Sequence, residues 1–196
     1  QSHSILTNRE RALFRGLGII SSGTVLGPAS AWANTSFVGR TRELAELARM
    51  LQDPKCRLIT LLGPGGVGKS RLAMQTAVTH SKSFADGAAF VPLVEAGNIE
   101  EIALAAISAL ELPLPSKRSP LDYLAVGLQA SDMLIVMDNF DHLVDKKSLI
   151  VDLLRIAPAI KILVTSRARL HLESEWIYEL DGLEVPLSVA TTGANE

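Results

Sequence analysis

Residues 63–70 read GPGGVGKS and combine four glycines with a lysine and a hydroxyl side chain. Glycine lets a loop curl with its N–H groups pointing inward, around an anion such as a phosphate. An apolar run at 56–62 precedes the loop and a helical pattern follows it, so the positive end of the helix faces the same anion. The order matches the G-x-x-x-x-G-K-[ST] pattern without a mismatch, and it predicts a nucleotide-binding phosphate loop, here called the P-loop.

Each residue type in the P-loop has its own expected role in nucleotide binding. Lys69 reaches the β- and γ-phosphates, and the Ser70 hydroxyl is a ligand for Mg²⁺. The other predicted nucleotide contacts come from the loop and the start of the helix: Gly63, Gly65, Gly66, Val67, Gly68 and Arg71. The alternative is a glycine-rich turn beside a surface lysine, and the strand and helix patterns on either side favour the phosphate site.

A second apolar run, MLIVM at 133–137, ends at Asp138. A P-loop needs such a carboxylate at the end of another buried strand, where it holds Mg²⁺ through water. An aspartate in this position can instead cap the following turn. Because the P-loop is present, we favour the metal role and predict that Ser70 and Asp138 form the Mg²⁺ site.

The residue after Asp138 bears on the rate of catalysis. A fast ATPase of this class has a glutamate there to orient the attacking water, whereas this chain has Asn139, whose amide cannot take a proton. Asp141 and His142 follow closely and are alternative bases. The sequence therefore predicts slow turnover.

A third apolar run, KILVT at 161–165, ends in a polar tip followed by Arg167. An arginine beside the nucleotide can sense whether the γ-phosphate is present. The alternative is that Arg167 forms a surface ion pair with Glu173 or Glu175, and the sequence leaves both possibilities open.

Composition restricts the class of protein. The chain has 196 residues, 47% of them apolar, which suits one compact domain. Its formal net charge of −2 gives no general attraction to nucleic acid or to an anionic membrane. The one cysteine, Cys56, cannot form an internal disulfide or a cysteine-based metal site, so we expect a cytoplasmic protein.

Apolar runs alternate with helical patterns along most of the chain. Strands are expected at 56–62, 87–95, 133–137, 161–165 and 175–180, and helices at 41–51, 69–81, 98–110, 119–130 and 146–157. Thr41, Asn98 and Ser119 are the expected N-caps. This alternation predicts an α/β fold with a parallel sheet and helices on both faces.

Four motifs together resemble a known family. FVGR..E at 37–43, the P-loop, LIVMDNFDHL at 134–143 and ILVTSRARL at 162–170 follow one another in that order. Their order and spacing resemble the nucleotide-binding domain of STAND ATPases, in the NB-ARC/AP-ATPase branch. The residue sequences of the last two motifs are most similar to those of bacterial multidomain transcriptional regulators.

The resemblance implies a P-loop NTPase fold of the additional-strand (ASCE) type. It implies a parallel five-stranded sheet in which the strand before Arg167 lies between the strands that carry the P-loop and Asp138. The implied ligands are ATP or ADP with Mg²⁺, and Arg167 meets the γ-phosphate. Val38, Gly39 and Arg40 lie against the adenine and ribose, an assignment that rests on the resemblance alone.

The resemblance also implies a domain organisation. It covers residues 37–186, the expected nucleotide-binding domain. Residues 187–196 form a tail toward a helical ARC domain, and residues 1–36 form an extension or a fragment of a neighbouring domain. This first segment also imitates a signal peptide, but glycines and serines interrupt its apolar part. It is similar to the opening of a winged-helix region as well.

Three functions follow from these observations. The favoured one is an ATP/ADP-dependent switch with slow Mg²⁺-dependent hydrolysis, which contacts ARC and winged-helix domains and can self-associate, without binding nucleic acid or membrane itself. The second is a fast motor ATPase or a small-molecule kinase. The third is an interaction module with a vestigial loop, which the intact P-loop and Asp138 disfavour.

Overall fold

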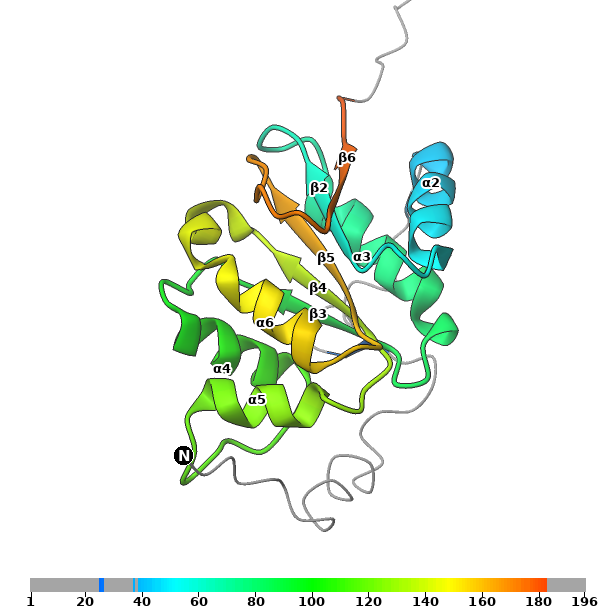
Figure 1. The fold of residues 1–196 in the computed structure, drawn as a ribbon. Helices are drawn as coiled ribbons and strands as arrows, with labels where there is room; N and C mark the ends of the chain where they lie inside the picture. The colour runs from blue at the N-terminus through cyan, green and yellow to red at the C-terminus, as the bar shows by residue number, and fades with distance from the viewer. Residues whose placement is uncertain (1–24, 27–36, 38, 183–196) are drawn as a thin grey trace, which may run out of the picture.

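The structure is a computed structural model that describes residues 25–26, 37 and 39–182 (Figure 1). Val38, the tail at 187–196 and most of the N-terminal extension lie outside the described residues. In the described part of the chain, no helix combines the length and apolar character needed to cross a bilayer.

One parallel sheet organises the chain, in the order β1-β3-β4-β5-β2-β6. Its main strands are β2 (Leu58–Leu62), β3 (Ala88–Pro92), β4 (Leu134–Asp138), β5 (Lys161–Ser166) and β6 (Glu175–Glu179). All five were predicted from their apolar runs. Strand β5 lies between β2 and β4, which confirms the predicted position of the strand before Arg167.

A sixth, very short strand was not predicted. Strand β1 (Val25–Leu26) comes from the N-terminal extension and pairs in parallel with the start of β3. Glycines and serines surround these two apolar residues in the sequence, so the pattern there gives no strand signal. The extension therefore supplies an edge of the sheet.

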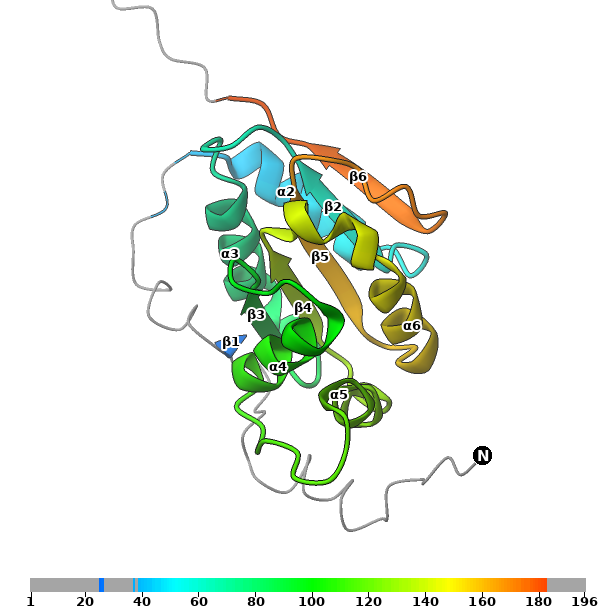
Figure 2. The same ribbon diagram turned by 90° about the vertical axis from the view of Figure 1, so that its left-hand side faces the viewer.

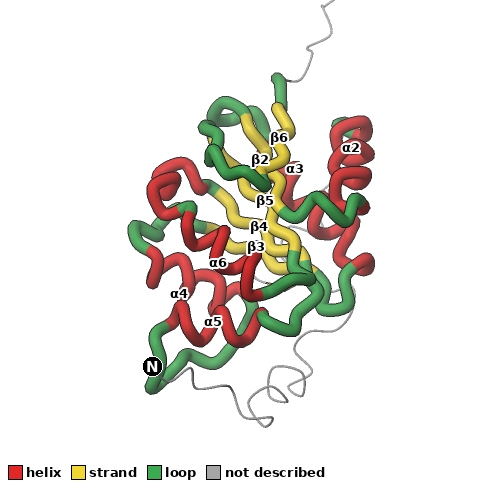
Figure 3. Tube along the Cα trace, in the orientation of Figure 1, coloured by secondary structure: helices red, strands yellow, loops and turns green. Residues whose placement is uncertain are grey.

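Helices cover both faces of the sheet (Figures 2 and 3). On one face lies α3 (Lys69–His80), and α2 (Thr41–Gln52) packs against it. The other face carries α4 (Ile99–Ala109), α5 (Pro120–Leu128) and α6 (Ser148–Ile156). Among residues 39–182 there are also two 3₁₀ segments, η2 (Ser81–Ser83) and η3 (Phe140–Lys146).

Two apolar layers form the core, one on each side of the sheet. Alternate residues of a strand point to opposite faces, so Ile135 and Met137 of β4 join the layer under α4, α5 and α6. Leu134 and Val136 join the layer that includes α3. Because the central strands are buried on both faces, they appear in the sequence as continuous apolar runs.

Side-chain caps fix where several helices begin. Asn98 accepts a hydrogen bond from the backbone N–H of Glu101 at 3.0 Å. Ser119 accepts one from the N–H of Asp122 at 3.3 Å, directly before Pro120. These two predicted caps are confirmed.

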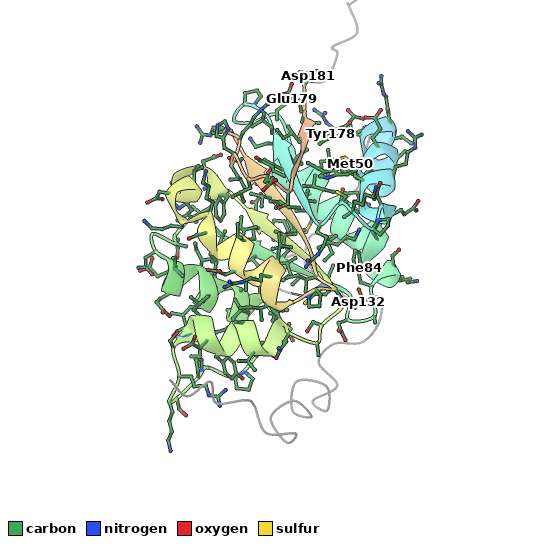
Figure 4. All side chains as sticks on the ribbon, viewed as in Figure 1. Met50, Phe84, Asp132, Tyr178, Glu179 and Asp181 are labelled. Carbon is green, nitrogen blue, oxygen red and sulfur yellow. The ribbon has the colours of Figure 1, made fainter. Side chains whose placement is uncertain are left out.

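The predicted cap at Thr41 is wrong. The N-cap of α2 is Arg40, whose backbone adopts the left-handed conformation with φ of 56°, and Thr41 is already the first helical residue. The side chain of Arg40 contacts the P-loop and the segment after β6 instead of capping the helix. At the β6 edge of the sheet, the Tyr178 hydroxyl donates to Glu46 of α2 at 2.7 Å, and Tyr178 points toward this helix in Figure 4.

Candidate functional site

The P-loop connects the end of β2 to the start of α3. Gly66 and Gly68 have φ of 79° and 96°, a left-handed backbone that side chains rarely adopt. Gly63 has a different requirement, since a Cβ there would lie 2.7 Å from the carbonyl oxygen of Leu180. These glycines therefore let the loop curl above the helix and pass close to the end of β6.

The ammonium group of Lys69 lies at the mouth of this loop. Its Nζ donates to the carbonyl oxygens of Gly63 at 2.7 Å and Pro64 at 3.0 Å. An ammonium has three N–H groups, so a further acceptor can be bound. Burial lowers the pKa of Lys69, while the carboxylates of Asp141 and Asp138 oppose that change.

The hydroxyl of Thr165 joins the ends of β4 and β5. It donates to Oδ1 of Asp138 at 2.6 Å and accepts a hydrogen bond from the backbone N–H of Asn139 at 2.8 Å. Thr165 is 1% exposed and Asp138 9% exposed, so this contact offsets the cost of burying a carboxylate. Asn139 has φ of 66°, and asparagine tolerates this left-handed conformation better than most residues.

Arg167 forms its ion pair with Asp141. Its Nε donates to Oδ2 of Asp141 at 3.0 Å, and its backbone N–H donates to Oδ1 of the same carboxylate. The alternative pairing with Glu173 or Glu175 is not observed. The Glu175 carboxylate instead accepts hydrogen bonds from the backbone N–H groups of Leu170 and Leu172.

A cavity of about 530 Å³ collects most of the predicted site residues. Those that line it are Gly65, Gly66, Gly68, Lys69, Ser70, Arg71, Asp138, Asn139 and Arg167. The sequence predicted no site role for a second group of lining residues: Phe37, Met74, Gln75, Phe90 and Pro92. Most of this group is apolar, so before folding these residues are indistinguishable from core.

Of the described residues, four other predicted contacts are not among those that line the cavity: Gly39, Arg40, Gly63 and Val67. The guanidinium of Arg40 donates to the carbonyl oxygens of Val67 at 2.9 Å and Asp181 at 3.0 Å. Gly63 donates its N–H to the carbonyl of Ser166 at 3.2 Å. Arg40 thus supports the P-loop, and its contact with adenine, like those of Val38 and Gly39, stays a prediction.

The side chains in the cavity fit a nucleotide phosphate with Mg²⁺. Lys69, Arg71 and Arg167 supply cationic groups, and the P-loop supplies backbone N–H groups at a helix N-terminus. Ser70 and Asp138 offer the oxygen ligands that Mg²⁺ takes. The donor set therefore agrees with the predicted ligand.

Comparison with curated sequences finds mycobacterial relatives, and no family model matches the chain. The chain is 36% identical over 152 residues to an uncharacterized protein of Mycobacterium tuberculosis, which covers 77% of this chain and 38% of the relative. It is 37% identical over 130 residues to a protein provisionally named an HTH-type transcriptional regulator in the same organism, covering 66% of this chain and 14% of that protein. The chain thus spans less than two fifths of the length of these relatives.

Comparison with solved structures shows the fold. The Drosophila ORC bound to DNA matches with a TM-score of 0.55 and 17% identity, over 72% of this chain and 43% of that one. The ORC2 protein of Aeropyrum pernix, solved in ADPNP and ADP complexes, matches with a TM-score of 0.52 and 19% identity, over 68% of this chain and 44% of that one. The chain has the α/β fold of the P-loop ATPases.

Replacing Thr165 by valine tests whether its hydroxyl supports the site. Thr165→Val leaves the Asn139 N–H and the buried Asp138 without their shared partner, so we expect a loss of about 1–3 kcal/mol in the free energy of unfolding. Urea denaturation measures this loss. The matched control is Thr79→Val on the exposed surface of α3, and equal losses in both variants would contradict the assigned role.

Proposed function

We propose that this chain is the nucleotide-binding switch domain of a STAND-class ATPase, which binds ATP or ADP with Mg²⁺ and hydrolyses ATP slowly. The observation that carries the proposal is that Lys69, Ser70, Asp138 and Arg167 line one cavity at the carboxyl edge of a parallel sheet. The second support is the unbroken P-loop pattern between β2 and α3.

Each of these residues has a definite part in the proposed function. The P-loop N–H groups and Lys69 hold the phosphates, and Ser70 and Asp138 hold Mg²⁺, Asp138 through water. Bound Mg²⁺ neutralises charge on the phosphate oxygens. Thr165 keeps Asp138 in one orientation through the hydrogen bond to Oδ1.

Slow hydrolysis follows from the groups next to Asp138. The amide of Asn139 cannot take a proton from water. Asp141 was an alternative base, but both of its carboxylate oxygens accept hydrogen bonds from Arg167. His142, the other candidate, has its Nε2 at 2.7 Å from the carbonyl oxygen of Ala96. These contacts favour a switch that keeps its nucleotide for long periods over a motor with fast turnover.

We further propose that the domain belongs to a bacterial multidomain regulator. The relative provisionally named a transcriptional regulator and the partial coverage of both relatives support this assignment. In such a protein, ARC and winged-helix domains contact this domain in the cytoplasm, with an adenine nucleotide as the ligand. Nucleotide-dependent self-association is part of the same proposal.

Removal of the Lys69 ammonium tests the phosphate contact. Lys69→Ala should weaken ADP and ATP binding by about 1.5–3 kcal/mol, or roughly ten- to a hundredfold, because a charge-assisted contact is lost. Ser70→Ala should reduce the dependence on Mg²⁺ more than the affinity itself. Titration calorimetry with and without Mg²⁺ measures both effects. The control is Lys55→Ala, an exposed lysine away from the cavity, and identical affinities for Lys69→Ala and this control would refute the proposal.

The turnover rate separates a switch from a motor. Without a carboxylate at position 139, we expect turnover far below the enzyme median of about 10 s⁻¹. Asn139→Glu should raise the rate, because glutamate can orient and deprotonate water. Phosphate release from Mg²⁺–ATP measures both rates, and a wild-type rate of tens per second would favour the motor.

A further inference from the structure

We propose that Asp141 is a positioning residue, whose carboxylate holds the Arg167 guanidinium over the P-loop and thereby lets the site distinguish ATP from ADP. This inference rests on the proposed function, and it concerns how the γ-phosphate is detected. The sequence indicates Asp141 only as an alternative base. Its contacts indicate a different role.

The carboxylate of Asp141 binds Arg167 at two points. One oxygen accepts a hydrogen bond from the backbone N–H of Arg167, and the other accepts one from its Nε–H at 3.0 Å. A single carboxylate therefore fixes both the end of β5 and the direction of the side chain that leaves it. The ion pair is only partly shielded, with the Asp141 side chain 20% exposed and that of Arg167 65% exposed.

This pair places the guanidinium beside the phosphate loop. A Cβ built on Gly65 would have the guanidinium carbon of Arg167 as its nearest neighbour, at 3.9 Å. Among the described residues, Asp141 supplies the only hydrogen-bond acceptors to Arg167. The N–H groups on its two terminal nitrogens thus remain for an anion, and Arg167 lines the cavity that contains Lys69.

The chain between β4 and η3 brings Asp141 to this position. The left-handed turn at Asn139 starts η3, and Thr165 ties this turn to β5. Two residues later along each segment, Asp141 meets Arg167. The Mg²⁺-site strand and the arginine are therefore connected by a short series of hydrogen bonds rather than by the sheet alone.

Holding the arginine matters because the side chain is long and exposed. A free arginine must lose rotamer freedom when it binds a phosphate, and a partner that orders it beforehand reduces that loss. The terminal γ-phosphate is present in ATP and absent in ADP. If Arg167 meets that group, the gain from positioning appears in ATP affinity and not in ADP affinity.

Simple charge repulsion makes the opposite prediction. Asp141 carries a negative charge in the same cavity as the phosphates, so removing that charge should strengthen the binding of both nucleotides. Positioning predicts weaker binding of ATP alone. The sign of the change in ATP affinity therefore separates the two effects.

The test compares ADP with the non-hydrolysable analogue AMPPNP, each with Mg²⁺, by titration calorimetry. Arg167→Ala should weaken AMPPNP binding about tenfold, and Asp141→Asn about three- to tenfold, while ADP affinity stays within about twofold. The double variant should be no weaker than Arg167→Ala alone, because Asp141 acts only through Arg167. The matched control is Asp145→Asn, a carboxylate on the same 3₁₀ segment that pairs with Lys146.

A second variant keeps the test decisive if Asp141→Asn folds poorly. Arg167→Lys retains the positive charge but lacks the Nε–H that Asp141 accepts, so it should also lose AMPPNP affinity severalfold. Wild-type preference for AMPPNP in Arg167→Lys would overturn the inference. So would unchanged or tighter AMPPNP binding in Asp141→Asn, or a double variant that shows the product of the two single losses.

The measurements distinguish a failure of this inference from a failure of the proposed function. If the wild-type chain binds neither nucleotide, the proposed function fails and the inference with it. If the wild-type chain binds both nucleotides, Lys69→Ala binds them more weakly, and Asp141→Asn has the same affinities as Asp145→Asn, only the inference fails.

Discussion

The placement of β5 between β2 and β4 is the constraint on which the site depends. The carboxyl ends of parallel strands meet at one edge of a sheet, where ligands of such folds bind. On one side the Thr165 hydroxyl of β5 bonds to Asp138 of β4, and on the other the carbonyl of Ser166 accepts the N–H of Gly63. One strand therefore sets the P-loop and the aspartate at a fixed separation.

Side chains of opposite charge lie together in the cavity that this edge forms. Lys69, Arg71 and Arg167 face the carboxylates of Asp138 and Asp141. The hydrogen bonds of Asp138 with Thr165 and of Asp141 with Arg167 keep the two carboxylates at separate places. In the proposed function, the cationic groups attract the phosphates and Asp138 holds Mg²⁺.

The sequence predicted β2, β3, β4 and β5 because they are largely buried and carry continuous apolar runs, whereas the edge strand β6 is only partly buried and was predicted from the short run at 175–180. It also predicted a P-loop between a strand and a helix and an aspartate at the end of another strand, and both positions are confirmed, while the roles of these residues stay predictions. The predicted N-cap at Thr41 was wrong because Thr41 is already the first helical residue of α2. The N-cap is Arg40, which has a left-handed backbone. Strand β1 was not predicted because two apolar residues give no periodic signal.

The partner of Arg167 was not identified from sequence. Glu173 and Glu175 were candidates by charge and proximity along the chain, whereas Asp141 lies on another segment and reaches Arg167 only after the left-handed turn at Asn139. Contacts that depend on how two strand ends meet leave no pattern in either segment. The apolar residues of the cavity, such as Phe90, could not be identified from the sequence for a related reason. The walls of a binding cavity and the core contain the same types of side chain.

Hydrogen–deuterium exchange with Mg²⁺–ATP tests the central claim most directly, because it reports which backbone segments the ligand protects. We expect slower exchange in peptides that contain residues 63–71, 138–141 and 165–167, and weaker protection of the same peptides in Lys69→Ala at the same nucleotide concentration. Unchanged exchange in these three segments, or protection confined to other parts of the chain, would contradict the proposed nucleotide site.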